Sequence, residues 1–454
     1  MEKSDLSIVI LAAGKGTRMK SSIPKVLHKV AGREMVNLTI DTAKALKPSN
    51  ISVVISEDVS DFADRIVLEH PTSKINFAIQ KERLGTAHAV NVGISALPRI
   101  GKTLLILYAD TPLLKIETLQ EMVTKIQNKQ SSICVLGFEC ADENNKYGRL
   151  VVNKSHLDKI IEYKDANPKE RKIKLCNSGV VAVDGDKIKS LLAKVDNKNA
   201  SGEYYLTDIV GLAKKSKLKC SYIEALESEV IGVNSRNDLA VVEIIKQNRL
   251  RSKLMENGVT MIDPASIHLS FDTEIENDVI IHPQVVFGVG VRIHSNVEIK
   301  SFSHLEGAEI KSGAIVGPFA RIRQGTFIDN NVRIGNFVEI KKSTIAKGAK
   351  INHLSYVGDS EIGADANIGA GTITCNYDGY NKFKTKIGKG AFIGSNTALI
   401  APVVIGDNAV IGAGSVISKD VGDNDLGVAR AKQIEIKDGG AKYHKQKNNK
   451  KVSK

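Results

Sequence analysis

A six-residue hydrophobic period in the second half of the chain constrains the fold more than any other feature. From about Met261 onward, an aliphatic residue or phenylalanine recurs at every sixth position, with occasional five-residue steps. These positions are 269, 275, 281, 287, 293, 299, 305, 310, 316, 322, 328, 334, 340, 345, 351, 357, 362, 368, 387, 393, 399, 405, 411 and 417. Neither the 3.6-residue period of a helix nor the two-residue period of a strand explains this spacing. The pattern indicates a hexapeptide β-helix, in which every coil covers the core of its neighbour.

One interruption of this period stands out. The step from Ile373 to Ile387 spans fourteen residues, where two regular steps would span twelve. The inserted stretch, TCNYDGYNKFKTK, includes Asn376, Tyr377, Tyr380 and Lys382. An ordinary surface insertion would explain its length. We favour a functional loop, because aromatic, amide and lysine side chains together are costly to leave in water.

The first half of the chain follows a different pattern, in which strand-like and helix-like segments alternate. The strand-like segments are residues 6–14, 50–56, 75–80, 103–110, 132–138, 148–152 and 178–184. Several of them are continuous apolar runs, as expected for strands that are buried on both faces. Residues 116–129 are typical of the helices between them. The alternation predicts an α/β domain with a mostly parallel sheet and a ligand site at the carboxyl ends of the strands.

A long helix is predicted between the two halves, at residues 235–258. Ser235 and Asp238 have the spacing of a capping box, and Gly258 is a natural helix stop. We therefore divide the chain into residues 1–232 (α/β domain), 233–258 (linker helix), 259–436 (β-helix) and 437–454 (tail).

The tail is basic and polar. Residues 437–454 hold seven lysines and one aspartate, a net charge of +6, which leaves +7 of the total +13 for the other residues. We expect this tail to be disordered. A solvated tail that aids solubility is the simplest interpretation, and weak contact with an anionic surface or nucleic acid is the alternative. The smaller positive balance of the remaining chain suits anionic small substrates.

Cysteine usage and hydropathy bear on the compartment. The five cysteines form no CxxC pair, which argues against a disulfide framework or a zinc site and favours a reducing compartment. The N-terminus lacks a signal-peptide pattern, and no apolar run approaches the ~20 residues that span a bilayer. We expect a soluble, cytoplasmic protein without a membrane span.

The first strand runs into LAAGKGTRM, residues 11–19. This loop matches neither GxGxxG nor the GxxxxGK[ST] phosphate loop. Its glycines would nevertheless let backbone N–H groups approach an anion, and Lys15, Arg18 and the nearby Lys25 add positive charge. A plain strand-to-helix turn explains the loop about equally well.

Polar side chains at three other segment ends are candidate ligand groups. Asp110 ends an apolar strand, where it is suited to bind Mg²⁺ on substrate phosphates or, alternatively, to cap a helix or occupy a turn. Asn234 offers an amide oxygen at another strand end, and it could equally cap the linker helix. Gln80, with the Gly85–Thr86 pair, could receive a planar base.

Taken together, the motifs resemble a known family. LAAGKGTRM, PK, QKERLGTAHA, YADTPLL, YGR, IEYKDA, NSG and GVNSR occur in the order seen in sugar-1-phosphate nucleotidyltransferases. With the hexapeptide half, residues 5–435 resemble the bacterial bifunctional N-acetylglucosamine-1-phosphate uridylyltransferase / glucosamine-1-phosphate N-acetyltransferase family. Residues 367–385 resemble the signature of that family's second site. The resemblance implies a Rossmann-like nucleotidyltransferase domain, a connecting helix and a left-handed parallel β-helix.

The resemblance assigns roles in the first domain. The residues implied to bind UTP and UDP-N-acetylglucosamine are Leu11, Ala12, Ala13, Gly14, Lys25, Gln80, Gly85, Thr86, Tyr108, Ala109, Asp110, Gly148, Glu162, Asn177 and Asn234. Of these, Gly148, Glu162 and Asn177 would contact the sugar, and Asp110 and Asn234 would hold Mg²⁺. Arg18 and Lys25 would stabilise the reacting phosphates. Ala109 and Ser178 depart from the family pattern, which has Gly and commonly Thr there, and an alanine methyl at 109 would intrude on close-packed backbone.

The resemblance also assigns an acetyl-transfer site to the second domain. His353 matches the family's general base, although a structural turn histidine is the alternative. The residues implied to bind glucosamine 1-phosphate are Arg323, Lys341, Tyr356, Asn367 and Lys382. Those implied to bind acetyl-coenzyme A are Ala370, Asn376, Tyr377, Ser395, Ala413 and Arg430.

These residues predict a bifunctional enzyme. Its β-helix would acetylate glucosamine 1-phosphate, and its first domain would combine the product with UTP to give UDP-N-acetylglucosamine for peptidoglycan and lipopolysaccharide synthesis. Mg²⁺ would be the cofactor, acetyl-coenzyme A and UTP the co-substrates, and the assembly a homotrimer. Two alternatives remain: a single-activity nucleotidyltransferase with a structural solenoid, and a nucleic-acid- or surface-binding protein that acts through its tail, which we consider unlikely.

Overall fold

The computed structural model describes residues 5–57, 62–71, 74–142, 144–154 and 156–452. The chain divides into two compact units, Met1–Leu250 and Arg251–Lys454. The dividing point falls inside helix α8 (Arg236–Glu256), which the sequence predicts at residues 235–258. The Asp238 carboxylate accepts hydrogen bonds from the backbone N–H groups of Asn234 (2.9 Å) and Ser235 (2.8 Å), and the Ser235 hydroxyl accepts one from Asp238 N–H (3.2 Å). The predicted capping box is therefore confirmed.

The first unit is built on one twisted sheet. Its main strands are β1 (Leu6–Leu11), β4 (Asn50–Ile55), β5 (Ile75–Ile79), β6 (Thr103–Tyr108), β7 (Ile133–Glu139), β10 (Leu175–Asp184) and β11 (Cys220–Ala225). They are ordered β11-β7-β10-β6-β1-β4-β5, and only β10 runs antiparallel to its neighbours. A hairpin of β8 (Arg149–Asn153) and β9 (His156–Ile161) pairs with β10. The predicted, mostly parallel α/β sheet is confirmed, and β9 and β11 add strands that the sequence did not predict.

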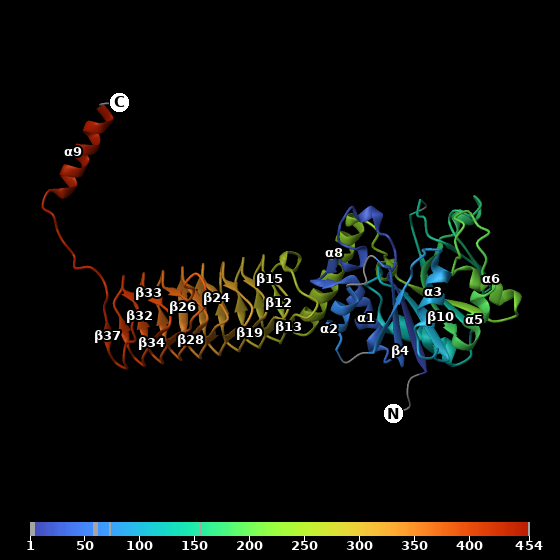
Figure 1. Cartoon of the computed structure of the whole chain (residues 1–454), viewed down its shortest axis with the longest axis horizontal. Coiled ribbons are helices and arrows are strands. Elements are labelled where there is room, and N and C mark those ends of the chain that lie inside the picture. The colour runs from blue at the N-terminus through green and yellow to red at the C-terminus, as the bar shows by residue number, and fades with distance from the viewer. Residues whose placement is uncertain (1–4, 58–61, 72–73, 143, 155, 453–454) are drawn as a thin grey trace. The chain divides into compact units, whose positions relative to one another are not determined.

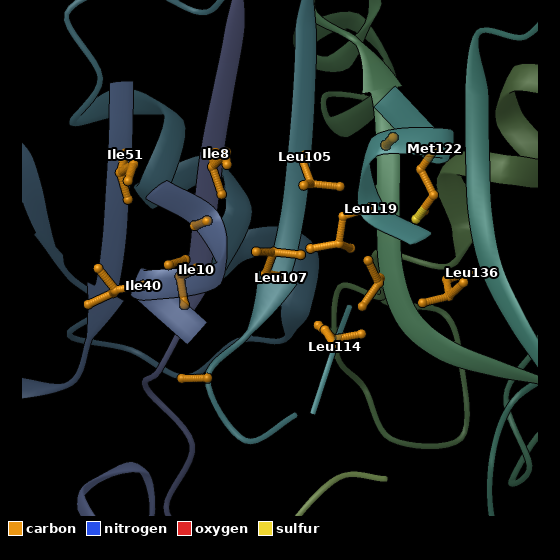
Figure 2. Close-up of a cluster of buried hydrophobic side chains, with 14 of the residues drawn as sticks. Ile8, Ile10, Ile40, Ile51, Leu105, Leu107, Leu114, Leu119, Met122 and Leu136 are labelled. Atoms are coloured by element: carbon orange, nitrogen blue, oxygen red, sulfur yellow. The ribbon is translucent and has the colours of Figure 1, made fainter. Parts of the chain in front are cut away.

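Helices cover both faces of this sheet. The helices are α1 (Met35–Ala45), α2 (Phe62–Glu69), α3 (Thr86–Ser95), α4 (Ile116–Gln127), α5 (Gly185–Leu192), α6 (Asp208–Lys215) and α7 (Glu227–Val230). Alternate residues of β1 belong to two separate hydrophobic clusters. Ile8 and Ile10 pack with α1 and α4 (Figure 2), and Val9 and Leu11 pack with α3, α5 and α6. Short elements complete the unit: η1 (Thr17–Met19), η2 (Lys25–Leu27), β2 (Lys29–Val30), β3 (Arg33–Glu34) and η4 (Glu170–Lys172).

The second unit winds through three parallel sheets, and its coils stack in a row in Figure 1. The first sheet contains β12 (Thr260–Met261), β14 (Ile280–Ile281), β17 (Glu298–Ile299), β20 (Ile315–Val316), β23 (Arg333–Asn336), β26 (Lys350–His353), β29 (Asn367–Ile368), β32 (Phe392–Ile393), β35 (Val410–Ile411) and β37 (Leu426–Gly427). The second contains β13 (Glu274–Ile275), β16 (Arg292–Ile293), β19 (Ala308–Ile310), β22 (Thr326–Ile328), β25 (Thr344–Ile345), β28 (Ser360–Ile362), β31 (Thr385–Ile387) and β34 (Val403–Ile405). The third contains β15 (Val286–Phe287), β18 (His304–Leu305), β21 (Arg321–Ile322), β24 (Glu339–Lys341), β27 (Tyr356–Gly358), β30 (Ile373–Cys375), β33 (Ala398–Ile400) and β36 (Val416–Ile417). A short 3₁₀ helix, η5 (Pro264–Ser266), lies in the first coil.

The six-residue period places the core of this unit correctly. Every position that the period predicts to be internal is buried. One step was misplaced by a single residue: Ile373 is 48% exposed, whereas Thr374 is 1% exposed and lies opposite Leu399 of the next coil. The six-residue steps therefore continue through 362, 368 and 374, and the insertion begins after Thr374. The three parallel sheets confirm the hexapeptide β-helix and are consistent with the left-handed form.

The tail differs from the prediction of disorder, because Gly439–Val452 forms helix α9. Residues 441–447 are nevertheless all exposed. Low apolar content explains this exposure, while local backbone hydrogen bonding, supported by alanine, glutamine and lysine, still forms a helix. Among the described residues, no helix is long and apolar enough to cross a membrane.

Candidate active sites

A cavity of about 300 Å³ opens at the carboxyl ends of β1 and β6. Ten predicted nucleotide-binding residues line it: Leu11, Ala12, Ala13, Gly14, Lys25, Gln80, Gly85, Thr86, Tyr108 and Asp110. Val26, Arg83, Ala89 and Glu203 complete the lining. Arg83 and Glu203 were missed. Arg83 lies inside the QKERLGTAHA motif and donates a hydrogen bond to the Ala13 carbonyl (3.0 Å), so its place in the motif was the available signal.

The glycine loop joins β1 to this cavity. Gly16 is in the left-handed region (φ 60°), and a Cβ there would lie 2.6 Å from the Lys25 Cβ, so only glycine allows the loop to pack on Lys25. Gly14 forms part of the cavity wall, and nothing within 4 Å would meet a Cβ placed on it. Arg18 is exposed on η1 and does not belong to the described cavity lining. Of the predicted cations, Lys25 is thus the one placed in the cavity.

Lys25 brings two predicted metal ligands together. Its ammonium group forms an ion pair with Asp110 Oδ2 and donates a hydrogen bond to Asn234 Oδ1 (3.2 Å). The Lys25 and Asp110 side chains are only 10% and 19% exposed. Because Ser235 and Asp238 cap α8, the Asn234 side chain is left to face Lys25. Asp110 and Asn234 therefore present their oxygens to a single cation position.

This oxygen pair fits Mg²⁺, which typically binds one or two protein carboxylates together with substrate phosphates and water. Among the described residues, no group of three or more His, Cys, Asp or Glu side chains could hold a metal. A metal at Asp110 and Asn234 would therefore need oxygens from the substrate to complete its coordination.

Gln80 and Gly85 form another part of the wall of the same cavity. Gln80 is 5% exposed, and its Nε2 donates to the Gly85 carbonyl (3.4 Å) and contacts His88 Nδ1 (3.1 Å). Gly85 has φ +120°, and a Cβ there would overlap the backbone of Tyr204. These contacts hold the Gln80 amide in the cavity wall next to Gly85, and recognition of a planar base there remains a prediction.

The three predicted sugar-binding residues lie together, outside the lining of the 300 Å³ cavity. Asn177 N–H donates to the Gly148 carbonyl (2.8 Å), and a Cβ on Gly148 would lie 3.5 Å from Glu162 Oε2. Glu162 accepts a hydrogen bond from the Thr207 hydroxyl (3.1 Å), and burial raises the pKa of its carboxyl group. Glu162 also lines a second cavity of about 460 Å³, together with Tyr205.

Tyr108 lies between the nucleotide and sugar groups. Burial, followed by the charges of Glu162 and Asp110, raises the pKa of its phenol group. A Cβ on Gly179 would lie 2.9 Å from the Tyr108 ring, so the glycine of the NSG motif makes room for this ring.

The two departures from the family pattern are accommodated. Ala109 is fully buried within a hydrophobic cluster, so its methyl group packs in the core and does not face the cavity. Its N–H still donates to the Leu11 carbonyl (3.0 Å). The expectation that its methyl would intrude is therefore wrong. Ser178 donates to the Leu136 carbonyl (2.7 Å), a bond that a threonine hydroxyl would make equally well.

In the β-helix, His353 lies at the end of β26 and is exposed. Its Nδ1 is 2.8 Å from Oδ1 of Asn336, the residue directly opposite on β23. Asn336 was not predicted as a site residue. The signal for it is the length of one coil, because Asn336 precedes His353 by 17 residues.

His353 belongs to a column of residues that continues from coil to coil. Hydrogen bonds at successive coils run from Leu354 N to Asn336 O (3.0 Å), Gly371 N to His353 O (3.3 Å), Asn396 N to Ala370 O (2.7 Å), Gly414 N to Ser395 O (2.7 Å) and Arg430 Nη1 to Ala413 O (2.6 Å). The predicted base and three predicted acetyl-coenzyme A residues, Ala370, Ser395 and Ala413, thus occupy equivalent positions in adjacent coils, and the Arg430 side chain reaches the carbonyl of the last of them. The structure brings these residues into one line, with small side chains next to His353.

Three of the five predicted sugar-phosphate residues, Arg323, Lys341 and Lys382, form a cationic cluster, whereas Asn367 lies on β29 of the first sheet. Lys341 lies beside Lys382, whose ammonium group lowers the pKa of Lys341. Arg323 contributes a further positive charge nearby and pairs with Glu339 (2.8 Å). Tyr356 lies on the adjacent strand β27, and Asn367 lies opposite Lys350 on β29. Adjacent ammonium groups repel each other, so an anion such as a phosphate would stabilise this cluster.

The inserted loop forms a small hairpin. Tyr377 and Lys382 make an isolated antiparallel bridge, and Asp378 accepts hydrogen bonds from the backbone N–H groups of Tyr380 and Asn381. Tyr380 at the tip is 92% exposed, whereas Asn376 at the base is buried and donates to the Asp359 carboxylate. Gly358 lies beneath the base, where a Cβ would crowd both the Tyr356 hydroxyl and the Asn376 amide. That the loop is functional remains a prediction.

Fold and sites together define a two-domain transferase: a nucleotidyltransferase unit followed by a hexapeptide-repeat acyltransferase unit. The model for the MobA-like NTP transferase domain matches residues 8–173, and the model for six bacterial transferase hexapeptide repeats matches residues 384–419. The chain is 50% identical over 455 residues to the bifunctional protein GlmU of Paramagnetospirillum magneticum, with complete coverage of both chains. It is 47% identical over 450 residues to the Zymomonas mobilis protein of the same name, covering 98% of each chain. For the Xanthobacter autotrophicus protein the identity is 48% over 442 residues, covering 97% of this chain and 98% of that protein.

The chain belongs to the bifunctional GlmU family. It is a bifunctional enzyme, with nucleotidyltransferase activity in the first unit and acetyltransferase activity in the second. Family membership over the full length favours this assignment over a single-activity enzyme with a structural solenoid.

Proposed function

We propose that the two sites act in sequence to make UDP-N-acetylglucosamine, with the residue roles that the sequence implies. The observation that carries the proposal is the grouping of each residue set: Asp110, Asn234 and Lys25 meet at the nucleotide cavity, and His353 lies in line with the acetyl-coenzyme A residues. The second unit acetylates glucosamine 1-phosphate, and the first unit transfers uridylyl from UTP to the product.

In acetyl transfer, the amine of glucosamine 1-phosphate attacks the carbonyl carbon of the acetyl thioester. The N–C bond forms, the C–S bond breaks, and coenzyme A leaves as a thiolate. His353 Nε2 takes a proton from the amine, a task suited to imidazole because it titrates near neutral pH. The sugar phosphate binds at Lys341, Lys382 and Arg323, and relief of their mutual repulsion favours binding.

In uridylyl transfer, a phosphate oxygen of N-acetylglucosamine 1-phosphate attacks the α-phosphorus of UTP, and the bond to pyrophosphate breaks. The nucleophile is already anionic, so this step needs alignment and charge neutralisation and not a general base. Lys25 and the backbone N–H groups of the glycine loop neutralise charge on the phosphates. When bound at Asp110 and Asn234, Mg²⁺ supplies further neutralisation of the phosphate charge.

We further propose that the enzyme is a homotrimer in the cytoplasm. Prisms with three flat faces associate naturally around a three-fold axis, and the exposed loop tip at Tyr380 would reach an adjacent subunit. The cytoplasmic location is proposed because UTP and acetyl-coenzyme A are made there.

The two reactions can be assayed separately on one preparation. Thiol release from acetyl-coenzyme A with glucosamine 1-phosphate reports acetyl transfer, and pyrophosphate release from UTP with N-acetylglucosamine 1-phosphate reports uridylyl transfer. His353→Ala should abolish thiol release and leave pyrophosphate release unchanged. His304→Ala, which removes an exposed imidazole from another coil, is the matched control and should retain both. If the wild-type enzyme released no thiol, the alternative of a single-activity nucleotidyltransferase with a structural solenoid would be supported instead.

A further inference from the structure

We propose that Asn336 is a positioning residue for acetyl transfer: its amide oxygen holds the imidazole of His353 in the tautomer whose Nε2 is free to accept a proton. The inference rests on the proposed role of His353 as the general base. Asn336 itself does not contact the reacting atoms, and acts only through His353.

The two side chains are placed next to each other by the stacking of coils. Asn336 and His353 are direct partners in the parallel register of β23 and β26, and Asn336 Oδ1 lies 2.8 Å from His353 Nδ1. Both residues stand just before a residue with positive φ, Phe337 (56°) and Leu354 (51°). They therefore occupy the same corner in successive coils, and their side chains leave the backbone in the same direction.

A glycine before Asn336 permits this approach. A Cβ at Gly335 would overlap the carbonyl oxygen of Asn352, which precedes His353. Behind the histidine, the Ser355 hydroxyl donates to the His353 carbonyl (2.8 Å), and Leu354 N–H donates to the Asn336 carbonyl (3.0 Å). The backbones on both sides of the contact are thus held at a fixed separation, and the amide reaches the ring without distortion of either strand.

The chemistry of the contact determines the protonation pattern of the ring. A neutral imidazole has one N–H donor and one acceptor nitrogen, and an amide oxygen can only accept. With Asn336 Oδ1 at Nδ1, the ring proton is on Nδ1, so the lone pair at Nε2 is available to the substrate amine. The opposite amide orientation would donate to Nδ1 and leave the proton on Nε2, where it would prevent base catalysis. The bond to Oδ1 persists after Nε2 takes the proton, since both nitrogens then donate.

An amide suits this task better than a carboxylate. A carboxylate next to the ring would stabilise the imidazolium form and shift the base toward protonation before the substrate arrives. Asn336 fixes the tautomer without adding a full charge. Because His353 is exposed, water would partly replace a missing Asn336, so loss of the amide should reduce the rate without abolishing it.

The test uses three substitutions in the full-length enzyme. Asn336→Leu removes the acceptor at similar volume, Asn336→Asp retains an acceptor, and Asn330→Ala is a matched control that removes an amide from the same coil. For Asn336→Leu, kcat of acetyl transfer should fall about 10- to 100-fold, with KM for both substrates within about twofold. Asn336→Asp should recover much of kcat and move the acidic limb of the kcat–pH profile to higher pH. Asn330→Ala should match wild type.

Uridylyl transfer, carried out by the first unit of the same chain, reports whether each variant is intact and should remain unchanged. The double variant His353→Ala/Asn336→Leu should be no slower than His353→Ala, because Asn336 acts only through the ring. An Asn336→Leu enzyme within twofold of wild type, or one in which KM and not kcat changes, would overturn the inference. Equal losses in the Leu and Asp variants would also overturn it. Full acetyl transfer by His353→Ala would instead refute the proposed function.

Discussion

Asp110→Asn separates the two activities most sharply, because it removes one charge while keeping the shape of the side chain. In the structure, the Asp110 carboxylate pairs with the Lys25 ammonium, which also binds Asn234. Both charged side chains are largely buried, so solvent screens their interaction little. The asparagine would leave Lys25 with two neutral oxygens and would remove the only carboxylate from the proposed Mg²⁺ ligands.

The expected magnitude follows from these contacts. Loss of one electrostatic group that acts on transition-state charge typically costs about 100- to 1000-fold in rate, or about 2.7–4 kcal/mol. We expect uridylyl transfer to fall by at least that factor and to need more Mg²⁺ for half-maximal rate. The stability cost should be about 1–3 kcal/mol, because the amide oxygen can still accept a hydrogen bond from Lys25. For a unit of this size, at about 2–4 °C per kcal/mol, that loss lowers Tm by about 2–12 °C.

Pyrophosphate release and thiol release, measured on one preparation, report the rates of uridylyl transfer and acetyl transfer separately. Acetyl transfer by Asp110→Asn should stay within about twofold of wild type, since the second unit has its own core. Asp64→Asn, at an exposed site on α2, is the matched control and should leave both rates unchanged. Equal loss of both activities in a folded Asp110→Asn enzyme would refute the two-site assignment. Unchanged pyrophosphate release would refute the role of Asp110.

Three further outcomes are expected. Residues 1–250 alone should retain uridylyl transfer and residues 251–454 acetyl transfer; inactive, insoluble fragments would show that the two units share a core. Burial raises the pKa of Glu162, so ionisation of this carboxyl group opposes folding once the pH exceeds its pKa in the unfolded chain. Glu162→Gln should therefore raise the urea midpoint of residues 1–250 near pH 7.5, and this gain should disappear toward about pH 4. The same substitution should raise KM for the sugar phosphate. Light scattering should give three times 49.1 kDa. Mixing His353→Ala with Arg430→Ala chains should restore part of acetyl transfer if these two groups act from different subunits. A monomer, or no recovery in mixed trimers, would place the site within one chain.

The β-helix was predictable because its signal is local. Each coil repeats the same requirement for one internal aliphatic residue, so the period needs no knowledge of distant contacts. The prediction failed by one residue at Ile373, where the aliphatic side chain is exposed and Thr374 faces the core. Hydrophobicity alone ranks Ile above Thr. The six-residue spacing from Ile368 would have identified Thr374.

The candidate sites were predictable only where a residue belongs to a motif. Asp110, Lys25 and Gln80 belong to recognisable stretches, and the structure places all three in the nucleotide cavity. Glu203 belongs to none of them and reaches the same cavity from a loop far away in the sequence. The choice between binding and capping at Asn234 also needed coordinates, since Ser235, Asp238 and Asn234 are adjacent and all have side chains that can cap a helix.

The column of residues that contains His353 shows that residues one coil length apart in the sequence lie next to each other in the β-helix. The intervals between its members are 17 residues from Asn336 to His353, 17 to Ala370, 25 to Ser395 and 18 to Ala413. The single long interval contains the inserted hairpin, whose bridge between Tyr377 and Lys382 lets the extra residues leave the coil. The register therefore resumes after the insertion, and Asn396 N–H still donates to the Ala370 carbonyl. Because the hairpin is closed at its base, the chain adds a loop to one coil without displacing the column to which His353 belongs.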